Sequence, residues 1–180
     1  MNAITTSAQT IDPHARLVEP TTLRIERLLP GPIERCWAYL TDSDLRRQWL
    51  AAGAMDLTPG AAFTFTWRND ELTDPPGARP EGFGAEHSMA SRVIAAEPPY
   101  RLEIAWGEGT VCFELAPAGD RVLLTLVHTR IVERDMRLKI GAGWHAHLDV
   151  MAAKLGGADL PPFWDHWRAL RDAYDRRMPA

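Results

Sequence analysis

The chain has 180 residues, 46% of them hydrophobic, and its 20 basic and 24 acidic residues give a net charge of -4. This length and composition support one domain with a sizeable core. The charges are mixed along the chain, so no basic block favours a nucleic-acid partner. No segment approaches the roughly 20 apolar residues of a membrane span, and the first twenty residues lack the apolar run of a signal peptide.

The chain contains two cysteines, Cys36 and Cys112, which fall in different predicted elements. Their spacing is not that of a metal site, and a disulfide between them is not indicated. Reduced thiols are typical of the cytoplasm, so we expect a cytoplasmic protein.

The N-terminal part of the chain predicts an arm, a strand and two short helices. Residues 1–20 are polar and lack apolar periodicity, which is typical of a flexible arm. Residues 21–29 alternate apolar and polar side chains and predict a strand that stops at a pair of prolines. Residues 33–40 and then 45–49 place apolar side chains at helical spacing, so two short helices should follow the strand.

From residue 55 onward the apolar period changes to two, which predicts strands with one face turned inward. The clearest runs are Phe63, Phe65 and Trp67; Leu102, Ile104 and Trp106; and Val111, Phe113 and Leu115. A weaker strand is expected over 85–96. Short turns rich in glycine and proline join the last three strands, which end at about residue 129 and should form an antiparallel meander.

A long amphipathic helix is predicted over residues 143–155. Its apolar seam consists of Trp144, Leu148, Met151 and Leu155, at i, i+4, i+7 and i+11. Gly156 and Gly157 end the helix. Because the seam must be covered by something large, we expect the strands upstream to wrap around it.

A charged helix with an apolar stripe is expected near the C-terminus, within residues 158–180. The stripe can pack on the outside of the domain or on a second copy of the chain. The main domain should therefore span 21–157, with the arm over 1–20 before it and the extra helix after it.

Several segments carry a resemblance to a known family. They are Pro32 to Trp37 with Thr41-Asp42 and Gln48-Trp49, Glu97 to Leu102 with Trp106, Leu124 to His128, and Gly143-Trp144 with Leu148-Asp149. In this order and spacing the chain resembles the START-like (SRPBCC, helix-grip) superfamily. Within it, the chain resembles the family of activators of the heat-shock protein 90 ATPase, in its C-terminal domain type.

The resemblance implies an α+β helix-grip fold, in which a curved antiparallel sheet, with two short helices after its first strand, wraps around a long C-terminal helix. It also implies a cavity between sheet and helix that commonly holds an apolar small molecule. Activity does not follow from the fold, because the superfamily includes lipid carriers, hormone receptors, cyclases, hydrolases and co-chaperones.

Signatures of covalent catalysis and of nucleotide cofactors are missing from the sequence. There is no G-x-S-x-G nucleophile elbow, no G-x-G-x-x-G after a strand and no G-x-x-x-x-G-K-[ST]. The segment Gly82-Phe83-Gly84, in a loop rich in proline, indicates only a turn. We therefore expect no cofactor.

The sequence His145-Ala146-His147-Leu148-Asp149 contains residue types that bind zinc. On a helix, however, His145 and Asp149 share one face at i, i+4, whereas His147 points away from both. The three side chains cannot meet at one ion, so no metal site is predicted.

His128 is the leading polar candidate for the cavity. It continues the parity of Leu124 and Leu126, which places it on the concave face of the last strand. There it can orient a carbonyl or carboxylate of a ligand, or act as a general base. The alternative is a structural histidine satisfied by the backbone or a neighbouring strand. His147 borders the helical seam beside Met151 and can also tip toward the cavity.

Seven tryptophans are more than core packing of one domain usually needs. Those on the concave sheet and near its open end should line the cavity, together with the helical seam. The predicted ligand-binding residues are Trp49, Phe65, Trp67, Trp106, His128, Trp144, His147, Leu148 and Met151.

Three functions remain open at this point. The leading hypothesis is a protein without catalytic activity that binds a small apolar ligand in the cavity. The second is a co-chaperone-like interaction module, whose outer surface contacts a chaperone or a second copy, so that Trp167→Ala would impair partner binding. The third is a hydrolase or cyclase that uses His128 as acid or base.

Overall fold

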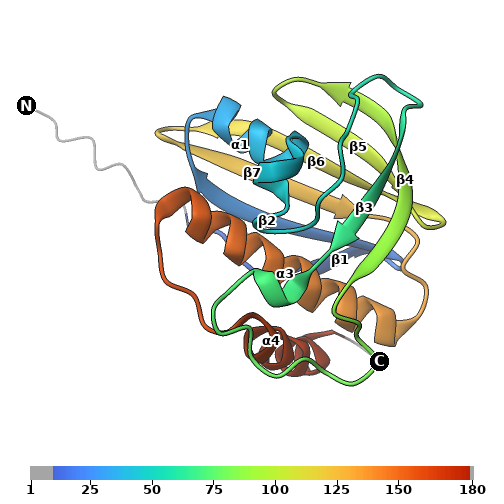
Figure 1. Ribbon diagram of the computed structural model, residues 1–180, viewed down its shortest axis with the longest axis vertical. Coiled ribbons are helices and arrows are strands. Elements are labelled where there is room, and N and C mark those ends of the chain that lie inside the picture. The colour runs from blue at the N-terminus through green and yellow to red at the C-terminus, as the bar shows by residue number, and fades with distance from the viewer. Residues whose placement is uncertain (1–9, 179–180) are drawn as a thin grey trace, which may run out of the picture.

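The computed structural model describes residues 10–178, which form seven strands and five helical segments (Figure 1). The strands are β1 (Arg16–Glu19), β2 (Thr22–Pro30), β3 (Ala62–Trp67), β4 (His87–Glu97), β5 (Arg101–Trp106), β6 (Gly109–Ala118) and β7 (Arg121–His128). The helices are α1 (Ile33–Thr41), α2 (Ser43–Arg46), the short 3-10 helix η1 (Asn69–Glu71), α3 (Arg134–Gly156) and α4 (Phe163–Arg177).

The strands form one sheet in the order β1-β2-β7-β6-β5-β4-β3, and every neighbouring pair is antiparallel. The sheet curves around α3, as Figure 1 shows. The predicted meander of β5, β6 and β7 is confirmed, and so is the α+β helix-grip architecture. Because alternate side chains of each strand face α3, apolar residues such as Leu126 and Phe113 are almost fully buried between sheet and helix.

The first strand of the sheet lies inside the segment that the sequence predicted to be a flexible arm. Residues 16–19 form β1, which pairs with β2 through Leu17 and Leu23. The strand has only four residues, too few to display an alternating pattern in the sequence. The rest of the predicted arm up to residue 9 lies outside the described residues. The two short helices therefore follow the second strand rather than the first.

Helix α3 is longer than the sequence predicted, because it begins at Arg134 and not at 143. Its end agrees with the prediction: the helix stops at Gly156, and Gly157 adopts a left-handed conformation at φ 75°. The added N-terminal turns contain Met136 and Lys139, whose mixed character hides the helical period.

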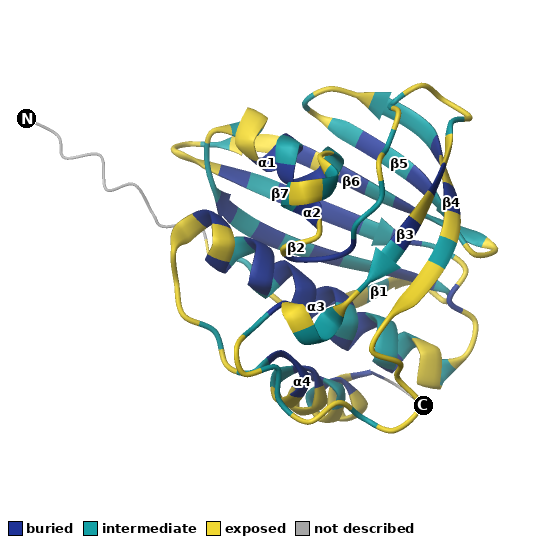
Figure 2. Cartoon of the chain, in the orientation of Figure 1, coloured by how far each residue is buried: buried dark blue, intermediate teal, exposed yellow. Residues whose placement is uncertain are grey.

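Helix α4 packs against α3 on the side away from the sheet (Figures 1 and 2). A Cβ atom at Gly141 would lie 3.3 Å from the Met178 side chain, and one at Gly143 would lie 3.9 Å from Trp167. The first distance is tight, so glycine at position 141 favours the close approach of Met178, whereas the second is an ordinary contact distance. Helix α3 is buried along most of its length, since the sheet covers one side and α4 covers the other.

Candidate functional site

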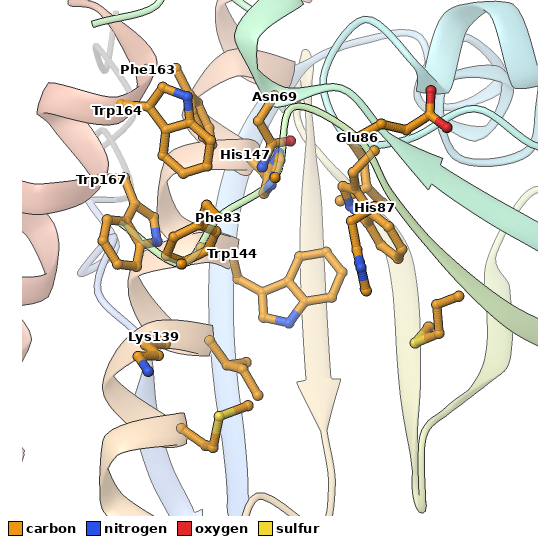
Figure 3. Close-up of a pocket in the computed structure, with 18 of the residues that line it drawn as sticks. Asn69, Phe83, Glu86, His87, Lys139, Trp144, His147, Phe163, Trp164 and Trp167 are labelled. Atoms are coloured by element: carbon orange, nitrogen blue, oxygen red, sulfur yellow. The ribbon is translucent and has the colours of Figure 1, made fainter. Parts of the chain in front are cut away.

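A cavity of about 440 Å³ lies between the N-terminal half of α3, α4, the loop after β3 and the ends of β4, β5 and β7. Its walls are Leu50, Trp67, Asn69, Gly82, Phe83, Gly84, Glu86, His87, Met89, Trp106, His128, Met136, Lys139, Ile140, Gly143, Trp144, His147, Phe163, Trp164 and Trp167. Figure 3 shows many of these side chains converging on one space. The volume is within the range of small-molecule sites.

Aromatic rings make up most of the cavity wall. On the sheet side, Trp106 lies 5.0 Å from Trp144 of α3 and 5.5 Å from Trp67 between ring centroids. On the other side, Trp164 and Trp167 project from α4 (Figure 3). Rings at these distances form tilted and edge-to-face contacts, which hold the wall in place and present both faces and edges to an occupant.

The loop between β3 and β4 closes the cavity against α4. Phe83 lies 5.2 Å from both Trp164 and Trp167 between ring centroids. Although 38% of Phe83 is exposed, its ring therefore forms part of the wall. The segment Gly82-Phe83-Gly84 does contain a turn, as the sequence indicated. The sequence did not show that this turn packs on α4.

Hydrogen bonds fasten the first half of this loop to the start of α4. The indole nitrogen of Trp164 donates to Asp70 at 2.7 Å. The backbone nitrogen of Trp164 donates to the carbonyl of Pro76 at 2.9 Å, and that of Phe163 donates to the Thr73 hydroxyl at 2.9 Å. These bonds satisfy backbone donors at the first turn of α4 that the helix itself leaves free.

His128 lies at the end of β7 and is only 2% exposed. Its Nδ1 atom accepts a hydrogen bond of 3.0 Å from the indole nitrogen of Trp144. An indole N–H can only donate, so the proton of the neutral imidazole must be on Nε2. Burial lowers the pKa of His128 to about 4, so the ring is neutral at pH 7.

His147 lies one turn after Trp144 on α3 and is 7% exposed. Its Nδ1 atom lies 2.7 Å from the backbone carbonyl of Trp49, which can only accept. The proton is therefore on Nδ1, and Nε2 carries a lone pair. Burial lowers the pKa of His147 to about 4, although the bond to Trp49 opposes this shift.

Four further polar residues line the cavity: Asn69, Glu86, His87 and Lys139. The side chain of Asn69 makes no hydrogen bond with any residue in the described part of the chain, and its Oδ1 atom is buried. The two charged residues, Glu86 and Lys139, are ion-paired: Glu86 lies 2.8 Å from Arg68, and Lys139 lies 2.8 Å from Asp135. Both are partly exposed, so they belong to the rim of the cavity.

The structure brings five of the nine predicted ligand-binding residues to the cavity wall: Trp67, Trp106, His128, Trp144 and His147. The other four, Trp49, Phe65, Leu148 and Met151, are buried in the core and do not line the cavity. For these four the expectation that they line the cavity was wrong. Ligand contact by the first five stays a prediction.

These four side chains pack elsewhere in the core. The indole nitrogen of Trp49 donates to the carbonyl of Tyr39 at 2.8 Å, which fixes the ring against α1. Phe65 packs beneath the guanidinium of Arg46, 5.2 Å from its ring centroid, and behind Trp67. Leu148 and Met151 follow the helical seam onto the sheet. The cavity instead lies beside a second stripe of α3, formed by Met136, Lys139, Ile140, Gly143, Trp144 and His147.

The loop and α4 contribute to the cavity although the sequence did not predict it. The C-terminal helix was expected on the outside of the domain or on a second copy, yet its residues Trp164 and Trp167 are buried at the cavity. A signal did exist for α4, because its apolar residues recur at helical spacing. The position of α4 beside the cavity is set by tertiary packing and cannot be deduced from this helical spacing.

His145 and Asp149 do not line the cavity, whereas His147 does. The helical geometry had predicted that His147 points away from the other two. Asp149 receives hydrogen bonds from Arg27 at 3.0 Å and from His166 at 2.8 Å, and His145 bonds the hydroxyl of Tyr174 at 2.9 Å. Burial raises the pKa of Asp149, but the bond from His166 and the charge of Arg27 outweigh it and hold the pKa below its ordinary value.

This network joins β2, α3 and α4. The Tyr174 hydroxyl also accepts a bond of 2.7 Å from the backbone nitrogen of Ala15, which anchors the segment before β1. Within residues 10–178, no group of three or more histidine, cysteine, aspartate or glutamate residues is arranged to hold a metal ion.

The helices of residues 10–178 include none that combines the length and the apolar character needed to cross a membrane.

Comparisons with known proteins agree with this fold. The family model described as activator of Hsp90 ATPase homolog 1-like protein matches residues 30–156. No protein among the curated sequences matches the chain.

Solved structures extend the similarity. The solution structure of the protein encoded by gene BPP1335 of Bordetella parapertussis is 38% identical, covers 94% of this chain and 92% of its own, and superposes with a TM-score of 0.77. A conserved protein of unknown function from Enterococcus faecalis, EF2215, is 19% identical, covers 91% and 88%, and gives a TM-score of 0.67. CalU16 from Micromonospora echinospora is 21% identical, covers 86% of each chain and gives 0.61. The last two similarities concern the fold alone.

Proposed function

The chain belongs to the family of activator of Hsp90 ATPase homolog 1-like proteins, and from that premise we propose that it binds a small, mostly apolar ligand in the cavity between sheet, α3 and α4. The family and its START-like fold support, in general, a ligand-binding or polyketide-cyclase-like domain. The finer assignment depends on the site.

The observation that carries the proposal is the cavity itself: about 440 Å³, walled by rings such as Trp106, Trp144 and Trp167. Pockets of this size and apolar character bury most of the surface of a small molecule. The ligand would gain about 25 cal/mol for each Å² of apolar area removed from water. Shape and desolvation supply the affinity, and a few polar groups orient the ligand.

Native mass spectrometry tests the proposal. Gently purified protein should carry a bound small molecule that is absent from the denatured sample, and the mass of that molecule identifies its class. The Trp106→Ala variant removes one wall of the cavity and should lose the molecule. Tyr100→Ala removes an aromatic ring that is 55% exposed on the surface, and should retain it. A wild-type protein that is bare and binds no apolar probe would refute the proposal.

The hydrolase or cyclase alternative requires His128 to act as acid or base. In the structure, the lone pair of this histidine accepts the bond from Trp144, and the nitrogen left for a ligand carries a proton. Since the pKa of His128 is lowered to about 4 by burial, the ring is a weak base at neutral pH. These features favour orientation of a ligand over catalysis.

The co-chaperone alternative relied on the apolar stripe of α4 as a surface for a chaperone or a second copy. The stripe, including Trp164, Trp167 and Tyr174, is buried against the domain. The variant Trp167→Ala therefore tests cavity and core rather than an outer surface, so the sequence-based design of that experiment was wrong. Partner binding would have to use other residues, and we favour the ligand-binding function.

We place this function in the cytoplasm. Cys36 and Cys112 are both free thiols, and burial raises the pKa of Cys36 to about 11, which leaves it unreactive. Two unpaired cysteines fit a reducing compartment.

A further inference from the structure

The two buried histidines of the cavity are held in opposite tautomers by the protein. His128 accepts the indole N–H of Trp144 at Nδ1, whereas His147 donates from Nδ1 to the carbonyl of Trp49. In both rings Nδ1 is occupied by a protein group. The atom left for a ligand is therefore Nε2 in both cases, but with opposite character: an N–H donor on His128 and a lone-pair acceptor on His147.

Neither Nε2 atom has a protein partner among residues 10–178. Besides the Nδ1 bonds, these rings make aromatic contacts: His128 lies 5.6 Å from Trp106, and His147 lies 5.0 Å from Phe163, between ring centroids. Neither Nε2 atom is fully buried, in contrast to Oδ1 of Asn69. Since both residues line the cavity, its wall presents, besides Asn69 and His87, an unpaired donor on His128 and an unpaired acceptor on His147.

The interior of the cavity offers no unpaired formal charge within the described chain. Both histidines are neutral, because burial lowers the pKa of each to about 4. At the rim, Lys139 is already paired with Asp135, and Glu86 with Arg68. A carboxylate would lose its hydration on entering without gaining an opposite charge, which disfavours fatty acids and other anions.

From this geometry we propose that the ligand is an uncharged aromatic molecule with a carbonyl-type acceptor that binds Nε2–H of His128 and a hydroxyl-type donor that binds Nε2 of His147. This deepens the proposed function and rests on it. The surrounding indole rings select a flat aromatic body, and the fixed tautomers select its polar substituents. A ligand with the two substituents exchanged in position would place its carbonyl against the lone pair of His147, so that two acceptors face each other.

The tautomers can be measured without any ligand. In protein labelled with ¹⁵N-histidine, the imidazole nitrogen shifts distinguish the two neutral tautomers. At neutral pH, His128 should be protonated on Nε2 and His147 on Nδ1. The variants His128→Phe and His147→Phe assign the signals, since each removes one set. Equal tautomers in the two rings, or a charged ring, would overturn the proposal.

A matched series of probes tests the selection by calorimetry: fluorene, fluorenone, a ring-hydroxylated fluorene, and a hydroxyfluorenone that carries both groups at opposite ends. Each hydrogen bond should raise the affinity about three- to tenfold, so the hydroxyfluorenone should bind most tightly and fluorene least. A fluorene carboxylate should bind more weakly than fluorene.

In His128→Phe, which keeps an aromatic ring but loses the donor, the advantage of fluorenone over fluorene should disappear, whereas that of the hydroxylated fluorene should remain. Tyr100→Ala, changed on the outer surface, should preserve the wild-type order of affinities. Equal affinities for all four neutral probes would overturn this inference and leave the proposed function standing. Binding of none of them would count against both.

Discussion

Asp70 accepts a hydrogen bond of 2.7 Å from the indole nitrogen of Trp164, and this bond joins the loop after β3 to α4. The second carboxylate oxygen of Asp70 lies 2.9 Å from Arg79, within the same loop. The loop and α4 together form one side of the cavity. The bond therefore connects a segment of irregular backbone to a rigid helix at the place where a ligand would be enclosed.

Replacing Asp70 by alanine should loosen this wall. Trp164 is 2% exposed, so its N–H would be left without an acceptor at a cost of about 1–2 kcal/mol in folding free energy. Fluorene affinity should also fall, because the loop would enclose the probe less often. Urea denaturation and calorimetry measure the two effects. Asp70→Asn keeps an acceptor oxygen for Trp164, so its stability and fluorene affinity should lie closer to those of the wild type. If the alanine and asparagine variants behave alike, the bond to Trp164 does not hold the wall in place.

Asn69 carries a buried polar atom that should lower the stability of the protein. Its buried Oδ1 atom has no hydrogen-bond partner in residues 10–178, and such a group costs about 1–3 kcal/mol. In Asn69→Leu this cost disappears while the volume stays similar, so the free energy of unfolding should rise by about 1 kcal/mol. Chemical denaturation of the two proteins without ligand measures the difference. A less stable leucine variant would show that the amide is satisfied in solution.

Stability should fall in mild acid because of the buried histidines. Burial lowers the pKa of His128 and of His147 from 6.5 to about 4, and that of His145 to about 3. Below pH 6.5 the unfolded chain binds protons that the folded chain does not, so the stabilisation is complete above 6.5 and is lost as the pH falls toward 4. Each histidine should contribute about 3 kcal/mol to this loss.

The variant His128→Phe isolates one of these contributions. Between pH 6.5 and 4, its free energy of unfolding should fall by about 3 kcal/mol less than that of the wild type. The substitution also leaves the indole N–H of Trp144 unpaired, but that cost does not change with pH. Urea midpoints recorded at a series of pH values give both slopes. Parallel curves for variant and wild type would mean that His128 is not desolvated in the folded state.

Much of the fold could be predicted because its elements have clear periods. The alternation of Leu102, Ile104 and Trp106 is a property of a strand with one buried face, and the sheet confirms it. The same parity argument placed His128 on the concave face. The first turns of α3 and the strand β1 lacked such a signal. The turns mix exposed apolar and charged residues, such as Met136 and Lys139, and the strand has only four residues.

The cavity was less predictable, because it is enclosed by parts that only tertiary structure brings together. Strand parity identifies Trp67 and Trp106, but no period marks Phe83 in an irregular loop. The seam of α3 suggested Leu148 and Met151, yet the sheet fills the space beside them, and the open space lies one stripe away, beside Gly143. A pattern in the sequence shows which residues avoid water; it does not show where packing leaves a void.

The last prediction separates binding from catalysis. A cyclase that works through an enol needs a base for a proton beside a carbonyl, and Nε2 of His147 is a buried lone pair at the cavity wall. Because the pKa of His147 is lowered to about 4, this nitrogen is too weak a base to remove a proton efficiently from the carbon beside a carbonyl. In D₂O, α-tetralone should therefore exchange the hydrogens beside its carbonyl at the same rate with wild-type protein as with His147→Phe, while calorimetry confirms that the wild type binds it. Nuclear magnetic resonance follows the exchange directly. An acceleration of about tenfold or more that disappears in His147→Phe would instead establish that the cavity performs acid-base chemistry.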